Sequence, residues 1–376
     1  MTSKSIFMTP FYNPELSYEE NYELGPFGTF SIPPASITRN NQDHGKVFGF
    51  PVATPFGIPS GPLLNSRYIR AAFRYGFDFC VYKTVRTSAH SSHPLPNVMA
   101  VHPQAGLDAE IRDIQADMHF HAQDLSITNS FGVPSLIPDL WQQDMAEALK
   151  CAGENQILAA SFQGTPGNGL LEDDYALAAR LVAETGIPVL EANMSCPNEG
   201  THNLLCFDID KVERIVHAIR NMVPDHPLII KLAYFKDDAL LDRLIGRIGH
   251  LVSGFSVINT LSMRPVSTDG TPALSNNRRE SGICGAAIRW AGLEMVSRLA
   301  KKREETLSDF TIIGIGGVST VEDYHLYRNK GADIVMAATA TMWNPYLAQS
   351  VKHSLAGTDG FMLFPENPAL PILAAE

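Results

Sequence analysis

Residues 191–198, with the sequence EANMSCPN, concentrate side chains that can do chemistry. Two amides, a hydroxyl and the Cys196 thiol lie beside Pro197, which stiffens the turn after a predicted strand. Because a free thiol titrates near pH ~8.5, a modest shift would make Cys196 a general base or acid. A lone cysteine is more often a small buried hydrophobe, but this polar position at a strand end favours the catalytic interpretation. Asn193 and Asn198 both donate and accept, which suits a flat ring with alternating N–H and C=O groups.

Two lysines, Lys83 and Lys231, stand near the ends of apolar segments. A buried amine needs an anionic partner, which a bound anionic ligand would provide. The same pattern is compatible with a Schiff-base lysine or with a lysine at the edge of the sheet whose amine reaches solvent.

A glycine-rich turn, GIGG at residues 314–317, closes a predicted strand and precedes a helix. The segment AATA at residues 337–340 closes the next and last strand. Barrel enzymes commonly bind phosphate with the loops after strands 7 and 8, where glycines let the backbone approach closely. These two turns are therefore candidates for a phosphate site, and the loop at residues 281–285 is expected to flank the same cofactor.

The elements that must position these residues alternate between short apolar strands and longer amphipathic helices. The predicted strands occupy residues 56–60, 77–84, 157–163, 188–193, 228–232, 254–259, 311–315 and 334–338. The predicted helices occupy residues 65–75, 136–152, 172–185, 208–222, 237–249, 286–304, 321–329 and 345–356. Eight such units favour an α/β fold, a closed (β/α)₈ TIM barrel, over a doubly wound open sheet, because the polar motifs follow the strands.

Three segments lie outside the regular alternation. Residues 1–45 are rich in Pro, Tyr, Asn and Ser, and they predict an irregular N-terminal extension that wraps a surface or a partner subunit. Residues 46–356 form the predicted barrel, in which the segment 90–126 is too long for a simple connection. We expect that segment to be an inserted hairpin or lid, and residues 357–376 to be a C-terminal tail.

The composition narrows the classes of function. A formal net charge of −11 disfavours binding to nucleic acids and to anionic membranes, while a local basic cluster could still bind a small anion. We identify no signal peptide and no run of apolar residues long enough to cross a membrane. Five scattered cysteines argue against disulfides, zinc or an iron–sulfur cluster and favour a cytoplasmic protein. No further ligand completes a metal site with His119 and His121.

Residues 193–198 resemble the active-site motif of class 1 dihydroorotate dehydrogenases, in which the cysteine is the catalytic base. The likeness continues in order over roughly residues 50 to 350, through PSG at 59–61, YKT at 82–84, NSFGVP at 129–134, IKL at 230–232 and INT at 258–260. Ser135 replaces an asparagine of many class 1 enzymes, and Ser281 and Cys284 stand where glycines are common. The segment DGTP at 269–272, with Arg278 and Arg279, resembles the flavin domain of dihydropyrimidine dehydrogenase.

The resemblance implies FMN as cofactor and a role for many individual residues. Substrate contacts are expected from Lys83, Asn129, Phe131, Gly132, Val133, Asn193, Asn198, Asn259 and Thr260. FMN contacts are expected from Ser60, Gly61, Lys83, Thr84, Asn193, Lys231, Asn259, Gly285, Gly316, Gly317, Ala338 and Thr339. The catalytic residue is expected to be Cys196, and a symmetric homodimer is implied.

The predicted reaction is the oxidation of (S)-dihydroorotate to orotate, a step of pyrimidine biosynthesis. Cys196 would remove the proton from C5, and hydride would pass from C6 to N5 of FMN. A dihydropyrimidine dehydrogenase-like flavoenzyme acting on another pyrimidine is an alternative. Alternatives from other classes are a Schiff-base aldolase barrel using Lys231 and a non-catalytic barrel that binds a flavin or phosphate. The electron acceptor is left open by the sequence.

Overall fold

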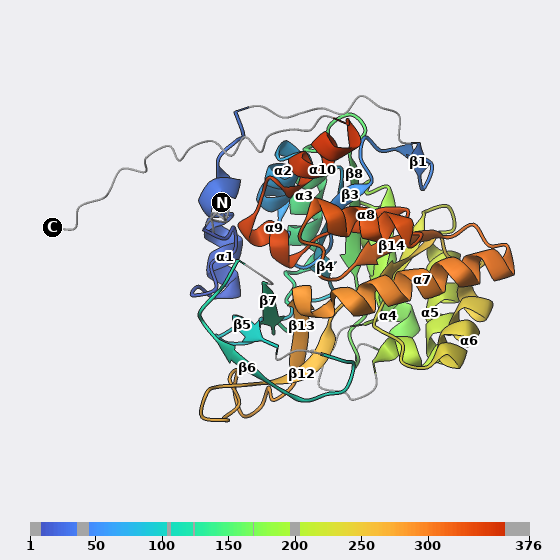
Figure 1. Cartoon of the computed structure of the whole chain (residues 1–376). Coiled ribbons are helices and arrows are strands. Elements are labelled where there is room, and N and C mark those ends of the chain that lie inside the picture. Colours follow the sequence, from blue (N-terminus) through green and yellow to red (C-terminus); the bar gives the residue numbers. More distant parts are fainter. Residues whose placement is uncertain are drawn as a thin grey trace.

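The computed structural model describes residues 9–35, 45–103, 107–122, 125–167, 169–195 and 204–357. Within these residues, eight parallel strands close into a barrel with helices around it (Figure 1). In chain order the barrel strands are β3 (Phe56–Ile58), β4 (Phe79–Val85), β8 (Ile157–Phe162), β9 (Val189–Asn193), β10 (Leu228–Leu232), β11 (Gly254–Val257), β14 (Thr311–Ile315) and β15 (Ile334–Met336). Each lies within or next to one predicted strand, which confirms the (β/α)₈ barrel.

A helix follows each barrel strand, directly or after an insertion. These helices are α2 (Ser66–Arg74), α3 (Pro138–Leu149), α4 (Leu171–Ala183), α5 (Ile209–Met222), α6 (Asp238–Ile248), α7 (Arg289–Thr306), α8 (Val321–Asn329) and α10 (Leu347–Leu355). Several begin where a side chain accepts a hydrogen bond from the first turn, as Asp208 does from Lys211 and Asp237 from Ala239. The short helix α9 (Thr339–Trp343) precedes α10 and was not predicted.

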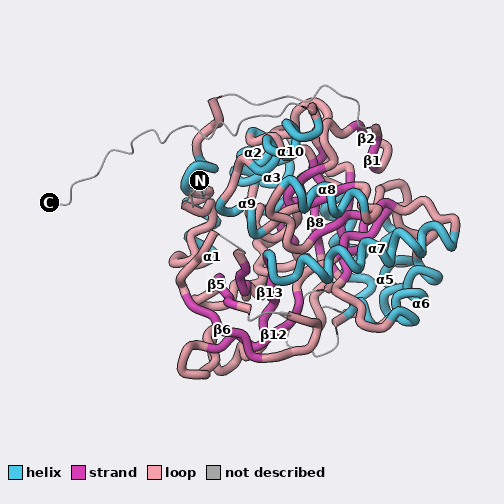
Figure 2. The backbone as a smooth tube through the Cα atoms, in the orientation of Figure 1, coloured by secondary structure: helices cyan, strands magenta, loops and turns pink. Residues whose placement is uncertain are grey.

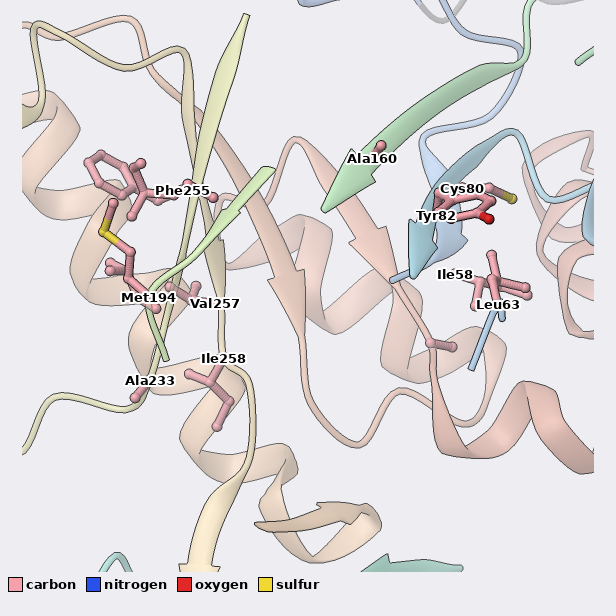
Figure 3. Close-up of a cluster of buried hydrophobic side chains, with 14 of the residues drawn as sticks. Ile58, Leu63, Cys80, Tyr82, Ala160, Met194, Ala233, Phe255, Val257 and Ile258 are labelled. Carbon is pink, nitrogen blue, oxygen red and sulfur yellow. The ribbon is translucent and has the colours of Figure 1, made fainter. Parts of the chain in front are cut away.

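Alternation along the strands separates two apolar layers, because successive side chains point to opposite faces of the sheet. Phe79 and Val81 of β4 belong to the cluster inside the barrel, together with Val189 of β9 and Ile229 of β10. Cys80 and Tyr82, the alternate residues of β4, pack outward against the helices (Figure 3). Full burial of one such large apolar side chain contributes about 1.5–3 kcal/mol.

A second, smaller sheet lies at one end of the barrel (Figure 2). Its strands are β5 (Val98–His102), β6 (Asp113–Asp117), β7 (Ser126–Asn129), β12 (Leu261–Val266) and β13 (Ser281–Gly285). They close in the order β12-β13-β7-β5-β6, and only the pair β12–β6 is parallel. The predicted inserted hairpin at residues 90–126 supplies β5 and β6. The sequence analysis missed β12 and β13, which come from a second insertion between β11 and α7.

The described part of the N-terminal extension packs against the barrel, and it is not wholly irregular. Helix α1 (Tyr18–Leu24) begins with a capping box, in which Ser17 and Glu20 each bond the other's backbone. Two further strands, β1 (Lys46–Val47) and β2 (Phe50–Pro51), form a short hairpin before β3. The side chain of Asn21 is fully buried and donates to three backbone carbonyls, which ties the segment together.

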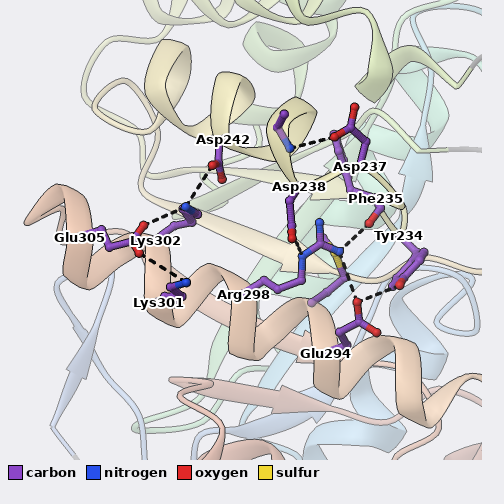
Figure 4. Close-up of polar contacts among 12 residues, drawn as sticks. Tyr234, Phe235, Asp237, Asp238, Asp242, Glu294, Arg298, Lys301, Lys302 and Glu305 are labelled. Carbon is purple, nitrogen blue, oxygen red and sulfur yellow. Dashed lines mark hydrogen bonds and ion pairs between the residues drawn. The ribbon is translucent and has the colours of Figure 1, made fainter.

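Helices α6 and α7 are joined on the surface by polar contacts (Figure 4). Arg298 of α7 pairs with Asp238 at 2.6 Å, and Lys302 pairs with Asp242 at 3.0 Å. Pairs of this kind contribute only about 0–1 kcal/mol each, so the apolar core carries most of the packing energy. None of the helices in the described ranges is long and apolar enough to cross a membrane.

Candidate active site

The apolar interior of the barrel changes to a polar layer toward the carboxyl ends of the strands. The alternation that buries Val81, Val189 and Ile229 continues into Lys83, Glu191 and Lys231 two residues later on each strand. All three charged side chains are buried, with Lys83 and Lys231 only 6% and 5% exposed. In barrel enzymes, this end of the strands carries the active site.

Lys231, Ser60 and Glu191 form a hydrogen-bonded chain in this layer. The Lys231 amine donates to the Ser60 hydroxyl at 3.1 Å and to the Ser60 backbone carbonyl at 3.4 Å. The Ser60 hydroxyl donates in turn to Oε1 of Glu191 at 2.9 Å. Two predicted cofactor residues are therefore hydrogen-bonded to each other, and one of them also bonds a carboxyl group that the sequence analysis did not single out.

A cavity lies above this layer, where the barrel meets the small sheet and the N-terminal segment. It brings together nine of the residues predicted for substrate or cofactor. These are Ser60, Gly61, Asn129, Phe131, Lys231, Asn259, Thr260, Ala338 and Thr339. They come from five separate strand ends with their following loops, so their convergence on one cavity depends on the fold.

Asn129, at the end of β7, is held by Cys284 of the neighbouring strand β13. The Asn129 side-chain nitrogen donates to the Cys284 sulfur at 3.4 Å, which leaves Oδ1 without a protein donor among the described residues. Burial raises the pKa of the Cys284 thiol, against hydrogen bonds from Thr339 and Asn129 and the charge of Lys231. A cysteine thus lies among three predicted ligand-binding residues, although the sequence analysis had noted it only as a departure from glycine.

Asn193 and Asn259 both hold the backbone or hydroxyl of Ser195. The Asn259 side-chain nitrogen donates to the Ser195 carbonyl at 2.8 Å, while Oδ1 of Asn193 accepts from the Ser195 N–H at 3.3 Å. The side-chain nitrogen of Asn193 donates to Gln163, so Asn193 is oriented below the cavity and does not line it. Cys196 and Asn198 lie outside the described residues.

Lys83 and Thr84 also lie beside the cavity without lining it. The Lys83 amine stands 6.0 Å from the centre of the Tyr18 ring, and the Thr84 hydroxyl donates to Ser161 at 3.0 Å. Tyr18 belongs to α1, so the N-terminal segment contacts a predicted substrate lysine. Tyr12, from the same segment, lines the cavity and packs edge-on against Phe131 at 5.4 Å.

The loop after Asn129 is held in a strained conformation. Val133 has a φ of 51°, which a β-branched residue rarely adopts, and Gly132 before it has a φ of 76°. Arg86, which is 1% exposed, donates to the carbonyls of Val133 at 3.0 Å and Gly132 at 3.4 Å. Neither Gly132 nor Val133 lines the cavity. Because the loop is fixed in this way, Asn129 and Phe131 are held in positions that line the cavity.

The glycine turn after β14 has a backbone conformation that favours glycine, as expected for the predicted phosphate turn. Gly316 and Gly317 have φ values of 125° and 68°, a region that favours glycine. A Cβ at Gly317 would lie 2.8 Å from the carbonyl of Gly285, so these two predicted loops touch. A Cβ at Gly285 would lie 2.3 Å from the Leu125 carbonyl, so close packing against the backbone requires a glycine at this position. None of the three glycines lines the cavity itself.

The residues present fit FMN. Gly61 has a φ of 135°, and a Cβ there would meet nothing within 4 Å, so the backbone leaves room for a flat ring. The Thr260 hydroxyl is buried without a hydrogen-bond partner among the described residues, which suits a bound polar ligand. The backbone N–H groups of Gly317 and Thr339 donate to no protein acceptor in the described ranges. They are therefore available to donate to the oxygens of a phosphate. Those ranges hold no cluster of three or more metal-ligating side chains.

A wider groove, with a volume of about 970 Å³, adjoins the cavity at Thr260. Arg278 and Arg279 line it, together with Lys236, Arg86 and the loop residue Gly132. Burial and the charges of Arg278 and His90 lower the pKa of His93 on the same wall. Although the protein is acidic as a whole, this groove is rich in cationic side chains.

The structure adds site residues that sequence reasoning missed. Tyr12, Tyr18, Glu191 and Cys284 lie in or next to the cavity. Glu191 could have been found from the alternation along its strand, because it stands between Val189 and Asn193 on the inner face. Tyr12 and Tyr18 carried no comparable signal, since the extension has no periodicity to orient them.

The chain is similar in sequence and in fold to several known proteins. The sequence profile of the dihydroorotate dehydrogenase family matches residues 117–358. A dihydroorotate dehydrogenase of Dictyostelium discoideum is 34% identical over 357 residues, which cover 90% of this chain and 95% of that protein. The catalytic subunit of dihydroorotate dehydrogenase B (NAD⁺) from Listeria monocytogenes is 31% identical over 184 residues, covering 48% of this chain and 57% of that subunit. A crystal structure of DHODH from Eimeria tenella in complex with ferulenol superposes with a TM-score of 0.69. At 18% identity, covering 87% of each chain, it supports the fold alone.

Proposed function

Because the chain belongs to the dihydroorotate dehydrogenase family, we propose that it oxidises (S)-dihydroorotate to orotate with FMN as cofactor. The family makes it an oxidoreductase acting on CH–CH donors. One observation supports both the proposed cofactor and the proposed substrate. A single cavity brings together Ser60, Lys231, Asn129, Asn259 and Thr339. It offers a cation, two amides and the loop of Ala338 and Thr339 side by side.

Two asparagines of the cavity are set up to accept hydrogen bonds from the pyrimidine. The side-chain nitrogens of Asn129 and Asn259 are engaged by Cys284 and Ser195, so each Oδ1 can accept from a ring N–H. Asn198 completes the proposed set of amides, and Thr260 adds a buried hydroxyl. Asn193, which does not line the cavity, supports the site through Ser195. Fixing the ring in a near-attack position can supply several kcal/mol, of the order of 7–11 in the best cases.

Cys196 acts as the base that removes the C5 proton, with Asn193 and Asn259 fixing Ser195 before it. When bound, FMN supplies the two-electron acceptor for the hydride that leaves C6. Lys83 stabilises negative charge on the substrate, and Lys231 does the same beside the flavin. The loops at Gly316, Gly317, Ala338 and Thr339 hold the phosphate, and Gly285 supports them from the neighbouring loop.

The cationic groove supports a carboxylate substrate over a neutral pyrimidine. Arg278 and Arg279 line it next to Thr260, so a carboxylated ring would enter the cavity along a favourable potential. A neutral pyrimidine, as in the dihydropyrimidine dehydrogenase alternative, would gain nothing from these charges. Membership of an oxidoreductase family argues against both the Schiff-base aldolase and the non-catalytic barrel. We retain a cytoplasmic homodimer that binds neither nucleic acid nor membrane.

The test is an anaerobic titration of the purified protein with dihydroorotate and, separately, with dihydrouracil. The protein is expected to be yellow, to release FMN without an adenosine moiety, and to lose its flavin absorbance with dihydroorotate only. FAD, or a folded protein without flavin, would contradict the cofactor. If dihydrouracil but not dihydroorotate bleaches the flavin, the proposed substrate is wrong and the protein acts on the neutral pyrimidine instead.

A further inference from the structure

Glu191 is the most deeply buried acidic side chain of the polar layer, and the proposed chemistry does not use it. It is 0% exposed and points into the barrel from β9, two residues before Asn193, which pairs with Lys231 on the adjacent strand. Oε1 accepts from Ser60, whereas Oε2 accepts no hydrogen bond within the described part of the chain. Burying an acidic group here is costly unless a nearby cation compensates for it.

That compensation comes from Lys231 through one hydroxyl. Ser60 accepts from the lysine at 3.1 Å and gives its single proton to Glu191 at 2.9 Å, so both of its hydrogen-bonding roles are fixed. A second bond, from the amine to the Ser60 carbonyl at 3.4 Å, fixes the direction of the lysine. Ser60 and Lys231 line the cavity while Glu191 does not, so the acid acts on the cavity through its neighbours.

We propose that Glu191, held against Lys231 through Ser60, offsets the positive charge of Lys231 and thereby lowers the reduction potential of the flavin. The inference rests on the FMN part of the proposed function. Dihydroorotate gives a hydride from C6 and a proton from C5 and becomes orotate. The hydride adds two electrons and one proton to FMN, and the ring gains one negative charge. A lone Lys231 would stabilise that charge strongly, whereas Glu191 opposes it and lowers the potential.

The measurement is the flavin reduction potential, obtained anaerobically by equilibration with a reference dye. In Glu191→Gln the opposing charge is gone, so the ratio of reduced to oxidised flavin at a fixed dye ratio is expected to rise about tenfold. For a two-electron couple, tenfold corresponds to about 30 mV. Lys231→Gln is expected to move the potential the opposite way. Glu191→Asp, which keeps the carboxyl, is expected to lie closer to the wild type than Glu191→Gln.

A matched control and a second variant keep the inference open to refutation. Glu147→Gln removes a carboxyl paired with Lys150 on the surface of α3, and it is expected to leave the potential unchanged. If Glu191→Gln alone fails to fold, the double variant Glu191→Gln/Lys231→Gln removes both buried charges, a change that buried pairs often tolerate. Its potential is expected to lie between those of the wild type and Lys231→Gln.

The outcomes separate this inference from the proposed function. An unchanged or lowered potential in Glu191→Gln overturns it and leaves Glu191 a purely structural residue. A double variant whose potential equals that of Lys231→Gln overturns it as well. A wild-type protein that carries no flavin contradicts the proposed function instead. A flavin-loaded wild type that dihydroorotate cannot reduce contradicts the proposed substrate and leaves this inference testable by the dye.

Discussion

Two helix glycines offer a matched test of how the outer helices support the phosphate turn. Gly292 lies in α7, and a Cβ there would come within 1.9 Å of the Tyr327 hydroxyl and 2.6 Å of the Ile315 carbonyl. Tyr327 is fully buried and donates to the Gly316 carbonyl at 2.6 Å. Gly246, in α6, is exposed, and a Cβ there would meet nothing within 4 Å.

The two Gly→Ala changes are therefore expected to have opposite signs. In Gly246→Ala the helix gains about 0.5–1 kcal/mol, because alanine loses less backbone entropy than glycine. Gly292→Ala gains the same amount but overpacks against the fully buried Tyr327 ring and the Ile315 carbonyl, which costs about 1–3 kcal/mol. At the upper end of that cost, Gly292→Ala is about 2 kcal/mol less stable than the wild type.

The displaced atoms also predict a loss of FMN affinity. Tyr327 and the Ile315 carbonyl must both shift; Tyr327 donates to the Gly316 carbonyl, and Ile315 directly precedes Gly316 in the chain. Loss of about 1.4 kcal/mol there weakens binding tenfold. Urea unfolding of the apoprotein and fluorescence titration with FMN measure the two effects. Equal stability and equal FMN affinity in Gly292→Ala and Gly246→Ala would refute the reasoning.

Two further predictions concern buried polar groups. Lys352 of α10 pairs with Asp78 at 2.8 Å, and both are at most 3% exposed, so Lys352→Met is expected to lower the free energy of unfolding by about 3–5 kcal/mol. Burial already raises the pKa of Asp78, and losing Lys352 raises it further. The folded variant then binds the proton more tightly than the unfolded chain does, so urea unfolding should show a smaller deficit at pH 5 than at pH 8. Asn21→Ala leaves three carbonyls without its donor and is expected to cost about 1–3 kcal/mol. Faster proteolysis within residues 9–24 of the folded protein would report it, and an unchanged cleavage rate would refute it.

The barrel could be predicted from the sequence because its elements are local. Each barrel strand is a short apolar run followed by an amphipathic helix, and that pattern is visible without long-range contacts. Lys83 and Lys231 were recognisable because a charge that ends an apolar strand is unusual. Their neighbours in space could not be derived, since Ser60 and Glu191 are 131 residues apart in the chain.

The hairpin of β5 and β6 was predicted, but the closure of the small sheet and the N-terminal contacts could not be derived for the same reason. Strand β13 pairs with β7 at Asn129 and Gly282, which lie more than a hundred residues apart, and nothing local marks that register. When that register is unknown, Cys284 can be recognised only as a substitution in a glycine loop. Its position next to Asn129 cannot be recognised. Tyr12 reaches the cavity because the N–H of Phe11 donates to the Met342 carbonyl of α9 at 2.8 Å, a contact between the two ends of the chain.

The central claim is that Cys196 is the base in the oxidation of dihydroorotate, and rapid kinetics tests it most directly. Stopped-flow bleaching of the flavin by dihydroorotate is expected to slow by about 10²–10⁴-fold in Cys196→Ala, the usual contribution of a positioned general base. Cys151→Ala, at a half-buried thiol that does not line the cavity, serves as the matched control and should bleach at the wild-type rate. Reoxidation of the chemically reduced Cys196→Ala enzyme should be unaffected, because it requires no proton from C5. Bleaching of Cys196→Ala at the wild-type rate would contradict the account.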